Sequence, residues 1–255
     1  MNHGTAQKLI ELNRQFYAQF GAAFAATRRK AQPGIGRVLE LLPQYAPLEG
    51  NWLDLGCGAG QVAVAWAKTG RTGSYLGMDF STELLAEARA MADGITAPAL
   101  HIGYESMDMD AESLQARFAP HSFDGILAFA SLHHLPTDKL RLQLLKTIQR
   151  LLTPGGLFIH SEWQFQHSAR LMERVQPWEL IGLSAQDVDE NDFLLDWRYA
   201  LPGQVEQIGL RYVHIYTREE LARLAQNSGF SIVFDFDSDG KEGNLALYQG
   251  WRSAD

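Results

Sequence analysis

The sequence predicts an α/β fold: a single domain built on a doubly wound, mostly parallel sheet. Between residues 51 and 163, short apolar segments alternate with amphipathic helical segments, and this βαβ rhythm is typical of a parallel sheet. After residue 230, two further apolar segments flank a polar turn. Such a hairpin requires an antiparallel pair, so the sheet should end with an antiparallel strand. A chain of 255 residues with 46% hydrophobic residues can bury the core of such a domain.

The elements before the insertion are predicted from periodicity and helix signals. Apolar residues at helical spacing predict a helix over 7–30, and a second helix follows Pro33 through 35–42. Strands are expected over 51–56, 75–80, 99–104, 123–130 and 157–163. The helices between them are expected over 60–70, 81–92 and 137–152, with Ser81 as a candidate N-cap.

Residues 164–216 break this rhythm with a polar and aromatic stretch. We therefore predict an insertion, acting as a lid over the carboxyl edge of the sheet, where open α/β sheets bind their ligands. A last helix over 217–230 opens with Thr217 and Glu220 in capping-box spacing and leads into strands over 231–237 and 244–251. The single domain, 1–255, thus comprises N-terminal helices (1–50), a core (51–163), the insertion (164–216) and a last helix with its hairpin (217–255).

Composition excludes several functions. The net charge of −8 argues against broad electrostatic binding to nucleic acid, although a local basic patch remains compatible with it. The single cysteine, Cys57, excludes an internal disulfide and a multi-cysteine zinc site, and we assign no metal. The N-terminus has no signal-peptide pattern, and no apolar stretch reaches the roughly 18–20 residues of a membrane helix. We therefore expect a cytoplasmic protein with no membrane contact.

The stretch "LDLGCGAGQ", residues 53–61, places three glycines between a strand and a helix. A dinucleotide-binding turn would have a third glycine at the position of Gln61. The carboxylate of Asp54, before the turn, would also repel a pyrophosphate. Asp54 instead suits a ligand with an ammonium group. At the end of the second strand, Asp79 can accept hydrogen bonds from both ribose hydroxyls, and Phe80 can lie on an adenine face. An ammonium group, a ribose and an adenine ring occur together in S-adenosylmethionine, a nucleoside with an amino-acid tail, so we predict this cofactor.

The motifs "LDLGCGAG", "GMDFS", "FDGILAFASLHHL" and "LLTPGGLFI" resemble those of the class I S-adenosylmethionine-dependent methyltransferases in order and spacing. The resemblance covers about residues 50–163 and implies a Rossmann-like seven-stranded methyltransferase sheet with its last strand antiparallel. One departure is Tyr104, where many relatives carry an acid, so the adenine contact there comes from the backbone or from Glu105.

The turn, the strand ends and this resemblance together predict the cofactor-binding residues. They are Tyr17, Arg28, Asp54, Gly56, Cys57, Gly58, Gly60, Asp79, Phe80, Ser106, Met107, Phe129, Ala130 and His134.

Further segments resemble the tRNA wobble-uridine carboxymethyl methyltransferases, which form the methyl ester of 5-carboxymethyluridine. These segments are "FAATRRKAQP" (24–33), in which Gln32 replaces the usual Trp, "SLHHL", "EWQF", "DFLLDWR" and "RYVHIY". The resemblance implies a tRNA substrate and a small zinc-binding activator protein as partner. Two alternatives stay open: an O-methyltransferase for a small carboxylate or other small molecule, with the aromatic insertion as lid, and a non-catalytic scaffold of the same fold.

The insertion supplies the candidate catalytic residues Arg211, Tyr212 and His214, which could form a substrate pocket. Trp197 with Arg198 could bind a base. Arg28 could pair with a carboxylate, either the methionine tail of the cofactor or an acid of the substrate. Methyl transfer to a carboxylate needs no strong general base, because the nucleophile is already an anion, so catalysis would depend on alignment and desolvation.

Three further polar motifs have a structural explanation as well as a functional one. The adjacent His133 and His134 point in different directions and make a poor metal pair, with one expected at the pocket rim and the other capping a helix. His160 and Glu162 share a strand face and either touch substrate or pack in the core. The segment from Asp235 begins like a calcium loop but has Ala at its twelfth position, so we predict a hairpin turn.

Overall fold

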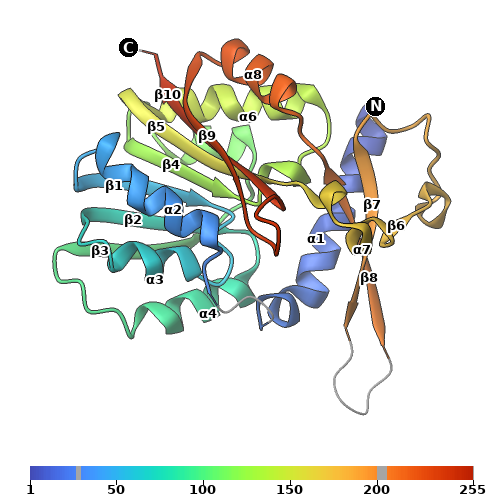
Figure 1. Cartoon of the computed structure of the whole chain (residues 1–255), viewed down its shortest axis with the longest axis horizontal. Helices are drawn as coiled ribbons and strands as arrows, with labels where there is room; N and C mark the ends of the chain where they lie inside the picture. Colours follow the sequence, from blue (N-terminus) through green and yellow to red (C-terminus); the bar gives the residue numbers. More distant parts are fainter. Residues whose placement is uncertain (27–29, 200–205, 255) are drawn as a thin grey trace.

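The computed structural model describes residues 1–26, 30–199 and 206–254 and contains the predicted sheet (Figure 1). Seven strands lie in the order β3-β2-β1-β4-β5-β10-β9. In this sheet β10 pairs antiparallel with both β5 and β9, and the other described pairings are parallel, so the predicted fold class is confirmed. The strands are β1 (Glu49–Leu55), β2 (Thr72–Asp79), β3 (Leu100–Ser106), β4 (Phe123–Phe129), β5 (Leu152–Trp163), β9 (Phe230–Ser238) and β10 (Ala246–Ser253).

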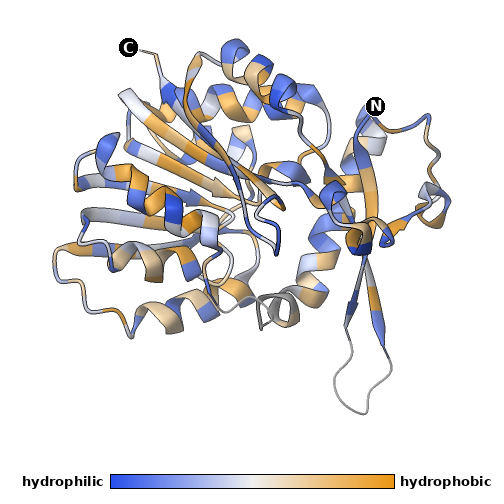
Figure 2. Ribbon diagram, in the orientation of Figure 1, coloured by the Kyte–Doolittle hydropathy of each residue, from blue (hydrophilic) through white to orange (hydrophobic). Residues whose placement is uncertain are grey.

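Helices cover both faces of this sheet, and two apolar cores lie between the layers. One face carries α2 (Pro33–Leu41), α3 (Gln61–Ala67) and α4 (Thr82–Ala92), and the other carries α5 (Ala111–Arg117), α6 (Asp138–Leu151) and α8 (Arg218–Asn227). Figure 2 shows the apolar strands between helices with polar outer faces. The short helix α5 was not predicted.

Two predicted helix caps form. The Ser81 hydroxyl accepts a hydrogen bond from the Leu84 amide at 3.3 Å, and Thr217 accepts one from the Glu220 amide at 3.1 Å. The capping box at α8 is only half made, because the Glu220 carboxylate turns to Arg141 and His214 instead of the helix terminus.

Strand register brings the candidate cofactor residues to one edge. The parallel pairing of β1 with β2 places Asp54 opposite Gly77, so Asp54 and Asp79 lie near neighbouring strand ends. The carboxyl ends of parallel strands meet at the same edge of a sheet, where ligands of this fold class bind. The following turn and the start of α3 complete this edge.

The predicted lid insertion contains a second, antiparallel sheet that periodicity did not reveal. Its strands are β6 (Val175–Gln176), β7 (Asp192–Tyr199) and β8 (Gln207–His214), preceded by α7 (Ala169–Met172). We call it the accessory sheet. The first helix, α1 (His3–Ala26), lies between the accessory sheet and the main sheet (Figure 1). It begins earlier than predicted, and Lys30 lies in a bend rather than in the expected helix.

Asn13 fixes α1 to the accessory sheet. Its side-chain oxygen accepts a hydrogen bond from the Tyr212 amide at 2.7 Å, and its side-chain nitrogen donates one to the Tyr212 carbonyl at 3.0 Å. The buried amide therefore satisfies both polar groups of one β8 residue, as a neighbouring strand would. No helix among the described residues is long and apolar enough to cross a membrane.

Candidate functional site

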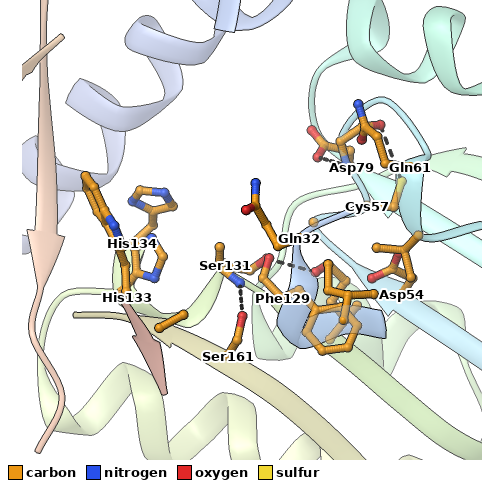
Figure 3. Close-up of a pocket in the computed structure, with 18 of the residues that line it drawn as sticks. Gln32, Asp54, Cys57, Gln61, Asp79, Phe129, Ser131, His133, His134 and Ser161 are labelled. Carbon is orange, nitrogen blue, oxygen red and sulfur yellow. Dashed lines mark hydrogen bonds between the residues drawn. The ribbon is translucent and has the colours of Figure 1, made fainter. Parts of the chain in front are cut away.

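A cavity of about 530 Å³ opens at the carboxyl edge of the main sheet, a size typical of cofactor and substrate sites. The glycine turn and Asp79 lie at one side, and His133 and His134 lie at the other (Figure 3). Many of the predicted site residues line it: Tyr17, Asp54, Gly56, Cys57, Gly58, Asp79, Phe80, Met107, Phe129, Ala130, His134 and Arg211.

The three glycines of the turn have different physical roles. All three have positive φ, which glycine adopts without strain. A Cβ on Gly58 would meet no atom within 4 Å, so this residue leaves open space at the cavity wall. A Cβ on Gly56 would lie 2.4 Å from the Ser131 hydroxyl.

Gly60 does not line the cavity, contrary to its predicted role in cofactor binding. A Cβ there would lie 2.9 Å from the Tyr104 hydroxyl and 3.0 Å from the Ala88 Cβ. Gly60 is thus needed where the start of α3 packs closely against α4.

Asp79 is held in place by the turn that it faces. Its two carboxylate oxygens accept hydrogen bonds from the Gly58 amide at 3.0 Å and the Ser81 amide at 2.9 Å. Burial raises the pKa of the Asp79 carboxyl, and the backbone hydrogen bonds partly oppose that rise. The carboxylate is therefore oriented by backbone groups and keeps further acceptor capacity for hydroxyl groups in the cavity.

Asp79→Ala should weaken S-adenosylhomocysteine binding by about 1.5–3 kcal/mol, the scale of a lost hydrogen bond to a charged group. The fold should persist, because Asp79 is at a strand end rather than in an apolar core. Isothermal titration calorimetry measures the affinity, and Asp79→Asn, which retains one acceptor, should lose less. An unchanged affinity in the alanine variant would contradict a role in ribose binding.

Asp54 is almost fully buried beside the glycine turn and lines the cavity. Burial raises the pKa of its carboxyl to about 7, the Tyr75 hydrogen bond opposes the rise, and Asp79 adds to it. The Tyr75 hydroxyl donates a hydrogen bond to one Asp54 oxygen. A cation in the cavity would favour the ionised carboxylate, so binding of an ammonium group would be coupled to loss of a proton.

The affinity for S-adenosylhomocysteine should therefore rise with pH up to about pH 7 and then level off. Below the raised pKa of Asp54 the protonated carboxyl must lose its proton on binding, which costs up to about tenfold in affinity per pH unit. Calorimetry between about pH 5.5 and 8, in buffers of different ionisation enthalpy, measures both affinity and proton release. Asp54→Asn should flatten the profile, and a flat wild-type profile would refute the coupling.

The segment after β3 reaches the cavity later than expected. Met107, Asp108 and Met109 line it, whereas the predicted Ser106 does not. Side chains alternate between the two faces of a strand, so Glu105 points away from its neighbours Tyr104 and Ser106. It pairs with Arg117 on the surface at 2.8 Å. Of the two open sources for the adenine contact, the Glu105 side chain is therefore directed elsewhere.

The end of the cavity opposite the glycine turn is lined by rings and one buried cation. The Arg211 guanidinium lies 4.9 Å from the Trp163 ring centroid and 5.4 Å from that of Phe16. The Tyr17 hydroxyl is 2.8 Å from Nε2 of His134. His133 and His134 both line the cavity in one 3-10 turn, and Thr137 caps the next helix, so the expectation that one histidine is a cap is wrong.

Two predicted catalytic residues, Tyr212 and His214, do not line this cavity. Side chains alternate along β8, so Arg211 faces the cavity while Tyr212 and His214 point to the opposite face. There Tyr212 and His214 both contact Asp192 at 2.7 Å. Arg198 is also outside the cavity and pairs with Asp196 at 2.9 Å. Arg28, predicted to bind a carboxylate, lies outside the described residues.

The remaining polar motifs make contacts within the protein, and Asp239 and Gly240 of the calcium-like segment also line the cavity. His160 and Glu162 are fully buried, contact each other at 2.9 Å and do not line the cavity. Burial lowers the pKa of His160 to about 3 and raises that of Glu162. The calcium-like segment is a hairpin turn in which Asp239 accepts hydrogen bonds from the Gly34 amide and the Tyr248 hydroxyl. The described residues contain no His, Cys, Asp and Glu cluster able to hold a metal.

Several lining residues carry no sequence signal of their own. Asn13, Ser161, Trp163 and Arg170 come from four separate elements or their flanks and meet only in the folded chain. Trp163 alone among them ends a predicted strand, so the strand-end rule of open α/β sheets favours it as a lining residue.

The strand order, the antiparallel β10 and the glycine-turn cavity define a class I methyltransferase. A family described as a methyltransferase domain matches residues 27–234, and the chain belongs to this family. A solved S-adenosylmethionine-dependent methyltransferase from Methanosarcina mazei shares the fold, with a TM-score of 0.64 and 22% identity over 88% of this chain and 99% of that one. The predicted enzyme class and cofactor, S-adenosylmethionine, are confirmed.

Some of the relatives have names that refer to tRNA. The tRNA (carboxymethyluridine(34)-5-O)-methyltransferase of Schizosaccharomyces pombe is 25% identical over 232 residues, which are 86% of this chain and 88% of that protein. The Probable tRNA methyltransferase 9B of Bos taurus is 28% identical over 195 residues, 75% of this chain but 38% of that longer protein.

Proposed function

We propose that this methyltransferase esterifies a carboxylate, and that its acceptor is the carboxymethyl group of a tRNA wobble uridine. The observation that carries the proposal is the position of Arg211, the buried cation at the end of the cavity opposite Asp79. An arginine can bind a carboxylate with two parallel hydrogen bonds. The rings of Trp163 and His133, which line the cavity, suit a planar base.

Resemblance supports the same acceptor. The Schizosaccharomyces pombe relative is named for this reaction, and it matches most of both chains. At the cavity mouth, Arg170 and Lys30 are exposed cations that could contact phosphates beside the modified nucleotide.

The residues at the glycine turn fit S-adenosylmethionine. Gly58 leaves the space that a side chain would fill, Asp79 offers acceptors for the ribose hydroxyls, and Asp54 offers a carboxylate for the ammonium group. When bound, this cofactor supplies an electrophilic methyl group. Arg211 would hold the acceptor carboxylate in line with that group, and the surrounding rings would exclude water, so the anion reacts in a weakly solvating site.

A second acceptor class has one observation in its favour. The net charge of −8 offers no broad basic surface for a polyanion, which favours a small carboxylic acid bound by the same Arg211. Both acceptors use the same cation and the same ring-lined end of the cavity. They differ in whether groups outside the cavity contribute to binding.

Methyl transfer from labelled S-adenosylmethionine tests the proposal on bulk tRNA and on a panel of small carboxylic acids. Base-labile label in tRNA, released as methanol, is expected for a methyl ester. Label that appears only in the small acids would select the second acceptor class. Base-stable label in either would contradict esterification.

A further inference from the structure

Five side chains on the far side of the accessory sheet form a closed ring of hydrogen bonds, which we call the buried cycle. The Arg141 guanidinium donates to the Tyr212 hydroxyl at 3.0 Å, and that hydroxyl donates to Asp192 at 2.7 Å. His214 contacts Asp192 through Nδ1 at 2.7 Å and Glu220 through Nε2 at 3.0 Å. Arg141 closes the ring by donating to Glu220 at 3.2 Å.

The buried cycle joins four elements and is almost closed to solvent. Arg141 comes from α6 and Glu220 from α8, whereas Asp192 belongs to β7 and the other two members belong to β8. The Glu220 side chain is 14% exposed, and the Arg141 and Asp192 side chains are 3% and 0% exposed. The cycle therefore fixes the accessory sheet to α6 and α8, two of the helices that cover the main sheet.

His214 bridges the two carboxylates of the cycle. Both ring nitrogens face carboxylate oxygens, and a neutral imidazole has only one N–H to donate. Arg141 and the His214 ring together face the carboxylates of Asp192 and Glu220. Removing one partner from such a buried set leaves an uncompensated charge, which is costly.

We propose that the buried cycle is a positioning device for the acceptor end of the cavity. Tyr212 and His214 occupy one face of β8. Arg211, the residue before Tyr212, occupies the other face and lines the cavity. Asn13 and His134 hold the Tyr212 backbone from the cavity side. The cycle therefore determines where Arg211 stands. The role assigned to Arg211 rests on the proposed function, whereas the positioning itself does not.

The test compares His214→Gln with the double variant His214→Gln/Glu220→Gln. The single change leaves the cycle with one surplus negative charge, and the second change restores the balance between Arg141 and Asp192. His101→Gln, an exposed histidine on β3, is the matched control. Hydrogen–deuterium exchange with bound S-adenosylhomocysteine should be about tenfold faster in 192–199 and 207–214 of the single variant, and unchanged in 49–55 and 72–79.

The double variant should recover most of this protection, and where tRNA is methylated its KM should follow the same pattern while S-adenosylhomocysteine affinity stays within about twofold. Exchange that is unchanged in the single variant, or not recovered in the double variant, would overturn the proposal. If the single variant does not fold, a folded double variant supports charge balance and an unfolded one overturns it. Absence of methyl transfer to tRNA by the wild type would refute the proposed acceptor. The hydrogen–deuterium exchange result would still test the positioning role of the buried cycle.

Discussion

Gly58→Val should abolish S-adenosylhomocysteine binding while the far-ultraviolet circular dichroism spectrum stays nearly native. Gly58 has a φ of +54°, a region that β-branched residues rarely adopt, and its amide donates the hydrogen bond that orients Asp79. An added Cβ would meet no protein atom within 4 Å, so the side chain would project into cavity space rather than into the core. We expect affinity to fall by more than about 100-fold, since steric exclusion and loss of the Asp79 geometry act together.

Gly70→Val is the matched control for this substitution. Gly70 also has a positive φ, +72°, and a Cβ there would likewise meet no atom within 4 Å, but this residue does not line the cavity. The two variants therefore share the backbone strain and differ in access to the cavity. Calorimetry should show binding lost in one and retained in the other. Equal losses would mean that strain alone explains the effect, and retained binding in Gly58→Val would mean that the turn is purely structural.

The cofactor half of the site could be predicted because its information is local in sequence. Asp54 near the end of β1 is followed directly by the turn that contains Gly58, and Asp79 ends the next strand, so the parallel-sheet rule is sufficient to bring them together. Gly60 was misassigned since its requirement comes from Ala88 on α4, a contact that no local pattern encodes.

The acceptor half could be predicted only in part, because it depends on pairings between distant segments. Strands β7 and β8 lack a strong alternation of apolar and polar residues, so periodicity does not predict these strands or their antiparallel register. That register decides which β8 side chains face the cavity, and a one-residue change reverses all of them. Of the three candidate catalytic residues, Arg211 lines the cavity, and Tyr212 and His214 do not.

The capping box at α8 illustrates how tertiary contacts override a local motif. The spacing of Thr217 and Glu220 predicts two reciprocal hydrogen bonds, but Glu220 serves the buried cycle and only the Thr217 half forms. A charged hydrogen bond to a buried partner is stronger than a cap to an exposed amide, so the carboxylate turns inward.

Arg211→Ala should lower turnover of a carboxylate acceptor by about 100-fold while S-adenosylhomocysteine affinity changes by less than a few-fold. The reason is position: Arg211 lies at the ring-lined end of the cavity beside Trp163, and Asp54 and Asp79 lie at the glycine turn. Loss of a cation that holds the acceptor removes alignment and charge recognition together, and neither contributes to binding of the cofactor product. Arg211→Lys keeps the charge but not the two-pronged donor geometry, so it should lie between wild type and the alanine variant.

Arg198→Ala provides the control for charge alone. Arg198 is on the neighbouring strand of the same accessory sheet, but it pairs with Asp196 and Glu206 outside the cavity. Both alanine variants therefore remove one positive charge from this sheet, and only Arg211→Ala removes one from the cavity. Turnover on tRNA and on small acids, together with calorimetry, separates the two. Full turnover by Arg211→Ala on every acceptor found would show that the acceptor carboxylate is bound elsewhere, and equal losses in both variants would point to long-range electrostatics.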